Sequence, residues 1–429
     1  MKYSAIKKDL YIDNRKNFSK HLKPNSLALF VSNDILPTNG DGSLGFIQNS
    51  DLLHLSGVDQ EDTILLIYPD AKDGKQKEIL FIKETSELIA IWEGAKLTKQ
   101  QATDVSGIIN IMWFHEFEKT FKAIGFQAEH FYLNSNEHTR RYIDMETAEM
   151  RFNKKIMAQF PLHHIERSAS IMHRIRSIKH PIEIELMQQA CNITEKGFRR
   201  LLSFTKPGVM EYEIEAELIH EFVRNRSRGF AYGPIIASGG NACVLHYVEN
   251  NKECKNGDVI LLDVAAEYGN YASDMTRCIP VSGKFTKRQR EVYDAVLRVM
   301  KGAAAILKPG NTFEKYNAAV GDMMTRELIQ LGLITEEDVK NQNPAWPAYK
   351  KYFMHGTSHF IGLDVHDVGF FAEPMLVGMA FTIEPGIYIP EENLGIRLEN
   401  NYIITATGNN DLMKNIPLEA DEIEALMAK

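Results

Sequence analysis

HGTSHFIGLDVHDVG, residues 355–369, is the most distinctive stretch of this chain and the starting point for its fold. It carries three histidines and two aspartates, which are His355, His359, His366, Asp364 and Asp367. Two histidines four residues apart occur on the helix of zinc peptidases, but that motif places a glutamate directly after the first histidine, and Gly356 stands there. Gly356 and Gly362 also disfavour a helix, because glycine loses more conformational freedom on ordering than any other residue. The stretch therefore predicts a non-helical segment that gathers histidines for another purpose.

Length, charge and composition bound the class of protein. The chain has 429 residues, enough for two domains, and its 44% apolar and 25% charged residues are ordinary for a soluble globular protein with a large core. The formal net charge of -8 gives no support for nucleic-acid binding. The longest apolar runs, such as 259–266, are too short to span a bilayer, so no membrane association is expected.

The N-terminal segment and the cysteines favour a cytoplasmic protein. Residues 1–17 are too polar for a signal peptide. The cysteines show no C-x-x-C spacing, and we interpret them as free thiols that lie mostly in the core. They are Cys191, Cys243, Cys254 and Cys278.

The chain divides near residue 160. Within 1–160, short apolar runs at 26–31, 63–69 and 78–83 predict strands, and helical segments lie between them. This alternation predicts an α/β domain.

The second part, 161–429, contains two pairs of predicted helices. They cover 180–202, 211–225, 286–310 and 311–332. Pro181 fits the first position of a helix, and Thr286 fits an N-cap. Lys-Pro-Gly ends the first helix of each pair, which is either a common helix stop or a trace of internal duplication. Two related halves would place a functional site at their junction.

The first helix pair is followed by a predicted hairpin over 256–283. If Tyr268-Gly269 is its two-residue loop, Asp263 and Asp274 lie directly opposite each other, with Cβ atoms about 5 Å apart. A buried carboxylate pair of this kind must share a proton or bind a cation. If the loop differs by one residue, one of the two aspartates is an ordinary surface charge.

The second helix pair is followed by another hairpin, over 379–408. Glu384 ends an apolar run, and Glu399 lies in an alternating strand pattern. Pro385 interrupts the ladder, so the register stays open. Each glutamate could face solvent, but a strand that ends directly before Pro-Gly is typical of a site.

Four carboxylates and an imidazole form an oxygen-rich ligand set. Such a set suits a pair of divalent cations better than one tetrahedral zinc, and paired cations can polarise a carbonyl and supply hydroxide at neutral pH. Arg397 lies two residues before Glu399, so it should share that strand face and can orient a carboxylate. The sequence alone therefore predicts a site for two divalent cations.

The same residues resemble the pita-bread metallopeptidases, and within them the Xaa-Pro aminopeptidases (aminopeptidase P). The resemblance is carried by DVA from Asp263, SDMTR around Asp274, the whole stretch 355–369, TIEPGIY around Glu384 and IRLE ending at Glu399. QNSDLLHLSGVD (48–59) and IWEGAKL (91–97) extend it more weakly into the first third of the chain.

The resemblance implies an α+β fold. A pita-bread catalytic domain over 161–429, with a curved and mostly antiparallel sheet, would follow a smaller α/β creatinase-like N-terminal domain over 1–160. The site would lie in the concavity of the sheet, with the helix pairs on its convex side.

The family pattern also implies the role of each site residue. Asp274 and Glu399 would bridge two divalent ions, most simply Mn²⁺ with Co²⁺ or Zn²⁺ as alternatives. Asp263 would hold one ion, and His359 and Glu384 the other. His246, His355 and His366 would line the substrate site, and Glu384 would carry a proton from a metal-bridging hydroxide to the departing proline nitrogen. The expected substrate is a peptide with proline in the second position.

Two alternatives stay open. A prolidase, which cleaves only Xaa-Pro dipeptides, needs a cation for the substrate carboxylate, and 367–396 contains no Arg or Lys. An inactive binding protein on the same fold would lack metal ligands, and none is missing. Asn400 and Asn401 replace acids that relatives often carry. We further expect a homodimer or homotetramer.

Overall fold

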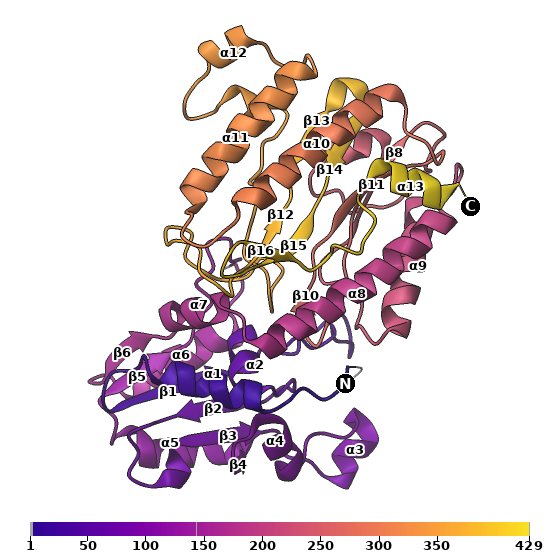
Figure 1. Cartoon of the computed structure of the whole chain (residues 1–429). Coiled ribbons are helices and arrows are strands. Elements are labelled where there is room, and N and C mark those ends of the chain that lie inside the picture. The colour runs from indigo at the N-terminus through magenta and orange to yellow at the C-terminus, as the bar shows by residue number, and fades with distance from the viewer. Residues whose placement is uncertain (1–2, 143, 429) are drawn as a thin grey trace. The chain divides into compact units, whose positions relative to one another are not determined.

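The computed structural model describes residues 3–142 and 144–428, which form two compact units. The N-terminal unit is Ala5–Arg176, and the C-terminal unit is Met1–Ser4 with Ser177–Lys429. The expected boundary after residue 160 therefore needs correction. Strand β6 (His164–Arg167) pairs in parallel with β5 (His130–Leu133), so the chain completes the sheet of the first unit before it leaves that unit (Figure 1).

A six-stranded mixed sheet forms the centre of the N-terminal unit, in the order β4-β3-β2-β1-β5-β6. Its remaining strands are β1 Ser26–Val31, β2 Ile64–Ile67, β3 Glu78–Ile82 and β4 Asn110–Trp113. The three predicted strands are confirmed as β1, β2 and β3. Side chains of a strand point alternately to the two faces of a sheet, so Leu27 and Leu29 join one apolar cluster, while Ala28 and Phe30 join the other.

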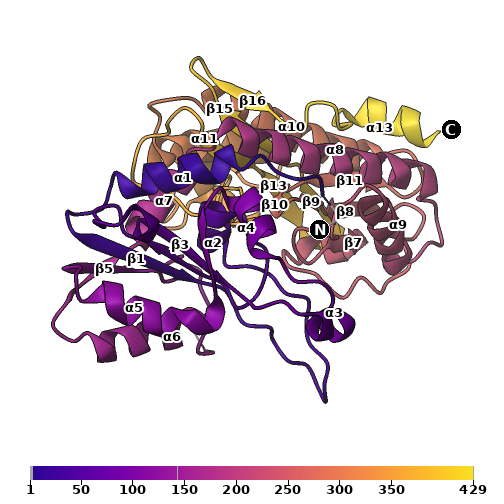
Figure 2. The ribbon, with the colours of Figure 1, turned by 90° about the horizontal axis from the view of Figure 1, so that it is seen from below.

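Helices cover both faces of this sheet. They are α1 Asp9–Ser19, α2 Ser50–Ser56, α3 Glu87–Glu93, α4 Lys99–Ser106, α5 Phe117–Gly125, α6 Ala148–Gln159 and α7 Ala169–Ser177, with short 3₁₀ turns η1 Gly74–Gln76 and η2 Phe114–Glu116. Phe18, Leu52 and Met172 from α1, α2 and α7 pack on one face, and Phe121 and Ile156 from α5 and α6 pack on the other. Figure 2 shows the two helix layers with the sheet between them. The predicted α/β domain is confirmed.

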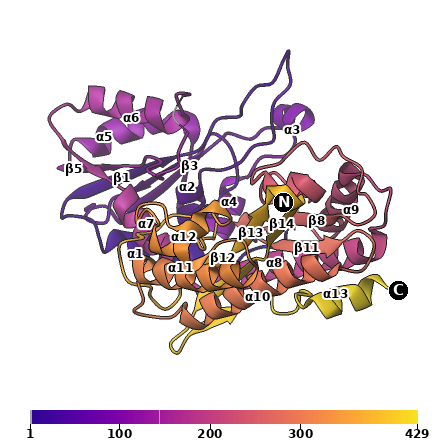
Figure 3. The ribbon, with the colours of Figure 1, turned by 90° about the horizontal axis from the view of Figure 1, so that it is seen from above.

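The helices of the C-terminal unit come in two pairs, as predicted. They are α8 Pro181–Phe204, α9 Glu211–Arg224, α10 Lys287–Ile306, α11 Phe313–Gln330, and the shorter α12 Glu336–Lys340 and α13 Ala420–Met427. Pro181 occupies the first turn of α8, and the Thr286 side chain accepts a hydrogen bond from the Gln289 amide, as an N-cap should. Helix α8 packs against α9, and α10 against α11 (Figure 3).

Both Lys-Pro-Gly turns end in a left-handed residue. Gly208 has φ 93° and Gly310 has φ 81°, a backbone region that glycine enters without steric cost. The two turns thus share a conformation as well as a sequence, and each leads into the second helix of its pair.

All strand pairings of the described C-terminal unit are antiparallel. The first half contains β7 Ile235–Ser238, β8 Val259–Asp263, β9 Glu267–Tyr268, β10 Tyr271–Ala272 and β11 Thr276–Pro280, and the 3₁₀ turn η3 Gly239–Cys243. The second half contains β12 Ala380–Ile383, β13 Gly386–Ile389, β14 Leu394–Arg397, β15 Asn400–Ile404 and β16 Asn409–Asp411, and the turns η4 Ala348–Lys351 and η5 Pro390–Glu392. The sheets are β11-β8-β7, β12-β15-β16, β9-β10 and β13-β14.

The predicted register of the first hairpin is wrong by two residues. Tyr268 pairs with Tyr271, so the loop is Gly269-Asn270 instead of Tyr268-Gly269. Gly269 and Asn270 have φ 61° and 70°, and positive φ at both loop positions is the requirement of the type I′ turn. Asp263 consequently faces Thr276 and not Asp274. A shift of two preserves the face of every side chain, which keeps both aspartates on the side predicted.

The histidine stretch is non-helical, as predicted, and runs beside β12. The Thr382 amide donates to the His359 carbonyl at 3.0 Å, and the Glu384 amide donates to the Thr357 carbonyl at 2.8 Å. Farther along, the Glu399 amide donates to the Thr276 carbonyl at 3.0 Å, which connects the strands of the two halves. These bonds bring both hairpins and the histidine stretch to one place.

The cysteines and the apolar character of the helices can be compared with the sequence predictions for the described residues. The four cysteines are free thiols, and all but Cys243 are buried, as predicted. No helix in 3–142 or 144–428 combines the length and apolar character needed to cross a membrane.

Candidate metal centre

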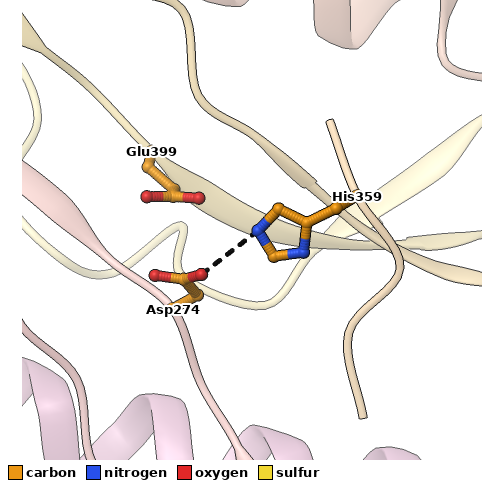
Figure 4. A group of neighbouring side chains, drawn as sticks. All are labelled: Asp274, His359 and Glu399. Atoms are coloured by element: carbon orange, nitrogen blue, oxygen red, sulfur yellow. Dashed lines mark ion pairs between the residues drawn. The ribbon is translucent and has the colours of Figure 1, made fainter. Parts of the chain in front are cut away.

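The five predicted ligands lie at strand ends or in the histidine stretch. Asp263 ends β8, Asp274 follows β10, Glu384 follows β12, Glu399 lies between β14 and β15, and His359 lies in the stretch itself. Ligand atoms of Asp274, His359 and Glu399 all lie within 4.8 Å of one another, and all three residues are buried (Figure 4). Glu384 joins them, with Oε1 3.7 Å from Nε2 of His359.

The tautomer of His359 is set by its own backbone. Nδ1 lies 2.9 Å from the Phe360 carbonyl oxygen, which can only accept, so Nδ1 carries a proton. Nε2 faces Oδ2 of Asp274 at 3.3 Å. Burial lowers the pKa of His359, but the contact with Asp274 and the charge of Glu384 outweigh burial and raise it. A cation is therefore favoured between Nε2 and these carboxylates, either as a proton on the nitrogen or as a metal ion.

Glu399 has one oxygen with a partner and one without. Thr276 donates its hydroxyl to Oε2 at 2.7 Å. Oε1 is buried and has no hydrogen-bond partner among the described residues. Burial, followed by the charges of Asp274 and Glu384, raises the pKa of Glu399 well above its usual range. An unsatisfied buried carboxylate oxygen is costly, and a cation would satisfy it.

Asp263 is fixed by two donors. Tyr232 donates its hydroxyl to Oδ1 at 2.6 Å, and Arg397 donates from Nη2 to Oδ2 at 2.6 Å. Burial raises the pKa of Asp263, the charge of Arg397 opposes that effect, and the charge of Asp274 adds to it. Each carboxylate oxygen keeps a second lone pair for a ligand.

Glu384 is a site carboxyl whose pKa lies near neutrality. Burial raises its pKa to about 7, while the positive charges of His359 and Arg397 pull the pKa down and Asp274 pushes it up. A carboxyl of this kind exchanges protons readily at physiological pH.

The donor set fits divalent cations. The carboxylates of Asp274, Glu399 and Glu384 gather around Nε2 of His359, and one oxygen of Glu399 lacks a hydrogen-bond partner among the described residues. Among the described residues, the cations that pair with these acids come from two side chains. His359 pairs with Asp274 and Glu384, and Arg397 pairs with Asp263. Hard cations prefer such oxygen ligands, so the residues present fit a divalent-cation site.

Two family models match the chain, and each match lies within one of the two units. A model of metallopeptidase family M24 matches residues 185–406, more than half of the chain. The chain belongs to metallopeptidase family M24. A model of the aminopeptidase P N-terminal domain matches residues 11–132.

Several relatives that match this M24 chain over nearly its full length are named aminopeptidases. The Xaa-Pro aminopeptidase of Haemophilus influenzae is 33% identical, over 99% of this chain and 98% of that protein. The structure of Pseudomonas aeruginosa aminopeptidase PepP matches with a TM-score of 0.90 at 28% identity, over 99% and 98% of the two chains. Zn-substituted Escherichia coli aminopeptidase P in complex with product matches with a TM-score of 0.87 at 30% identity, over 99% of each chain. These matches confirm the α+β fold with an N-terminal domain before a pita-bread metallopeptidase domain.

His355 of this M24 site is a neutral imidazole. Nε2 lies 2.7 Å from the Tyr388 hydroxyl, and Nδ1 lies 2.7 Å from the Gly356 carbonyl oxygen. Burial lowers the pKa of His355 to about 3, and the charge of Arg397 acts in the same direction. Nδ1 of His355 lies 3.7 Å from Oε2 of Glu384, but the neutral ring forms no ion pair with it.

The other two predicted substrate-side histidines are exposed. The ring of His366 meets that of His359 edge-on, with centroids 4.5 Å apart. His246 lies after η3, and its electrostatic interaction with His355 contributes to the lowered pKa of His355. Both therefore lie at the rim of the M24 centre.

Sequence reasoning missed three residues that organise the centre. Tyr388 accepts a hydrogen bond from Arg397 Nη1 at 2.8 Å, Tyr232 donates to Asp263, and Thr276 donates to Glu399. Tyr388 and Thr276 belong to the quoted motifs TIEPGIY and SDMTR and could have been found there. Tyr232 lies in GFAYGP, 229–234, which carries no such signal.

Proposed function

We propose that this chain is a metal-dependent Xaa-Pro aminopeptidase, which releases the N-terminal residue from peptides with proline in the second position. The observation that carries the proposal is the buried set of Asp274, His359 and Glu399, in which Nε2 of His359 faces carboxylate oxygens and one oxygen of Glu399 is unsatisfied. Full-length relatives that bear the name Xaa-Pro aminopeptidase support the reaction class.

The residues assigned to two cations are those of the sequence prediction. Asp263, Asp274, His359, Glu384 and Glu399 would hold the ions, with Asp274 and Glu399 shared between both. The oxygen-rich set favours Mn²⁺, with Co²⁺ or Zn²⁺ as substitutes. When bound, such ions supply charge stabilisation for the scissile carbonyl and a water of lowered pKa.

The side chains around these ligands orient the site and move protons. Glu384, with a pKa of about 7, can take a proton on a carboxylate oxygen and give it to the nitrogen of the departing proline. Arg397 holds Asp263 and the Tyr388 hydroxyl, and Tyr388 in turn donates to Nε2 of His355. This chain of contacts fixes a ligand and a substrate-side imidazole together.

Proline explains why a dedicated enzyme is needed. The peptide bond before proline has no N–H, so a site that recognises that group cannot bind it. His246, His355 and His366 are assigned to the substrate side, where they would contact the peptide around the proline ring. The proposal includes a homodimer or homotetramer in the cytoplasm.

Product analysis tests the proposal. The metal-loaded protein should release the first residue from Ala-Pro-Ala and leave Ala-Ala-Ala nearly intact, and excess chelator should stop the release. Equal cleavage of the two peptides would replace the proposal with a general aminopeptidase, and release of Ala-Pro as a unit would replace it with a dipeptidyl activity.

A further inference from the structure

Glu211, the first residue of α9, is a fully buried carboxylate outside the metal centre. It accepts hydrogen bonds on both oxygens. Oε1 accepts from the Ser238 amide at 2.8 Å and the Asn241 side chain at 3.2 Å, and Oε2 accepts from the Tyr247 hydroxyl at 2.7 Å and the Lys252 amide at 2.9 Å. One side chain thus satisfies four donors.

These donors lie in or directly before a single segment, residues 239–252, which we call the His246 loop. Ser238 and Asn241 stand at its beginning, and Tyr247 and Lys252 lie in its second half. Between them the loop is open to solvent, because Val244 is 54% exposed, Val248 is 60% exposed and His246 is exposed. The exposed tip is therefore held from its ends, by Glu211 beneath it and by the buried Asn250, whose side chain accepts from the Ile236 amide and donates to the Pro234 carbonyl.

The beginning of the loop also touches the strand of Arg397. A Cβ added to Gly395 on β14 would lie 2.4 Å from the Ala242 carbonyl oxygen, so η3 packs directly on that strand's backbone. The loop thus runs from the wall of the metal centre to His246, and Tyr247 ties the position beside His246 back to Glu211.

A carboxylate is the side chain that this arrangement requires. All four partners are donors, and hydrogen bonds to an ionised acceptor are roughly twice as strong as neutral ones. A glutamine has one acceptor oxygen and a donating NH₂ group, so in either orientation it would turn a donor toward a backbone amide and lose the bond from Ser238 or from Lys252.

We propose that Glu211 is a positioning residue that fixes the His246 loop and thereby holds His246 at the substrate side of the site. This inference rests on the proposed function for the role of His246. It assigns to Glu211 no contact with substrate or metal, so loss of Glu211 should weaken substrate binding more than the chemical step.

The test compares Glu211→Gln with Glu213→Gln, using the metal-loaded full chain. Glu213 lies in the same first turn of α9, is exposed, and accepts one hydrogen bond, from the Met210 amide, which a glutamine oxygen can replace. Glu211→Gln should raise KM for Ala-Pro-Ala about tenfold and change kcat less than about threefold. This pattern is expected when an interaction made equally in the ground state and the transition state is lost. Hydrogen exchange of amides in 239–252 should become at least tenfold faster, while metal content stays unchanged. Glu213→Gln should leave all of these at wild-type values.

A double mutant separates positioning from general loosening. If Glu211 acts through His246, the Glu211→Gln change should add less than about twofold to the KM of His246→Ala. Tyr247→Phe, which removes one bond and keeps the fold, should show a smaller change in the same direction. Unchanged exchange and KM in both Glu211→Gln and Tyr247→Phe, or additive effects with His246→Ala, would overturn the inference. The wild type could instead prove inactive while amide exchange in 239–252 still depends on Glu211. That result would overturn the proposed function, and Glu211 would then hold the loop without a role in substrate binding.

Discussion

Arg397 and Asp263 form a largely buried ion pair, with Nη2 of the arginine 2.6 Å from Oδ2 of the aspartate. The residues are 134 positions apart and come from β14 and β8, one strand from each half of the C-terminal unit. The same guanidinium donates to the Tyr388 hydroxyl and to Oγ1 of Thr276. The arginine that was predicted to orient a carboxylate therefore holds Asp263 directly, and reaches Glu399 through Thr276.

Replacing Arg397 with lysine should impair the enzyme even though the charge is kept. An ammonium is a point donor and cannot reproduce the planar fork that serves three partners. We expect roughly a 10²-fold loss in kcat/KM, the usual consequence of misplacing reacting groups by about 1 Å. Steady-state kinetics on Ala-Pro-Ala measures this loss.

Arg288 provides the matched control. It makes two hydrogen bonds to Glu392 on the surface, and exposed ion pairs contribute about 0–1 kcal/mol. Arg288→Lys should keep wild-type kcat/KM. A comparable loss in both variants would show that the arginine fork at position 397 has no special role.

The metal content of single variants should distinguish metal ligands from substrate-side residues. Asp274→Ala and Glu399→Ala should abolish two-ion binding, because each is assigned to both ions. His366→Ala should keep its metal and lose roughly 10²-fold in rate, as proton-transfer or oxyanion groups typically do. A metal-free His366→Ala beside a fully loaded His359→Ala would reverse the assignment of the histidines.

The sequence allowed the acids to be located, but their exact pairing depended on one turn. Asp263 and Asp274 are found because the hairpin pattern places both on one face of the predicted sheet, and that face survives a shift of two residues. The shift itself followed from Gly269-Asn270, where both residues take positive φ, a preference that Tyr268 lacks. The turn chemistry could thus have been read correctly from the sequence.

Other features depend on contacts that no local pattern encodes. The bond from Tyr232 to Asp263 spans 31 residues and follows from how the segment before β7 packs beside β8. The unit boundary shifted because β6, with the weakly apolar sequence HIER, gains its place by pairing with β5. The Tyr232–Asp263 bond and the boundary between the units both depend on contacts between residues far apart in the sequence.

Metal affinity should increase with pH between 6 and 8. The folded pKa of Glu384 is about 7, above the value near 4.3 of a free glutamate, so without metal the folded state binds more protons than the unfolded state in this range. Stability of the metal-free protein should therefore fall as pH rises, by about 1 kcal/mol for this carboxyl. Cations compete with these protons, so the gain in Tm on adding Mn²⁺ should be larger at pH 8 than at pH 6.

Thermal unfolding at both pH values measures this linkage. Glu384→Gln cannot titrate, so the fall in metal-free stability between pH 6 and 8 should become smaller in that variant. A gain in Tm that is equal or larger at pH 6 would contradict the raised pKa.

Tripeptides should be cleaved with higher kcat/KM than matching dipeptides. A dipeptide places its carboxylate beside proline, near four protein acids, where an unpaired charge costs several kcal/mol. The segment 367–396 offers no Arg or Lys, and Arg397 is committed to Asp263 and Tyr388. A longer peptide carries its carboxylate away from these acids. A tenfold preference for Ala-Pro over Ala-Pro-Ala would instead require a cation from elsewhere and favour the prolidase alternative.

The most direct test of the account is the hydrolysis of Ala-Pro-Ala during Mn²⁺ titration of chelator-stripped protein, with bound metal measured in the same samples. We predict no activity in protein verified as metal-free, and activity that rises with occupancy of the site formed by Asp263, Asp274, His359, Glu384 and Glu399. Full activity in the verified metal-free protein would contradict the central claim that these residues serve a metal-dependent peptidase.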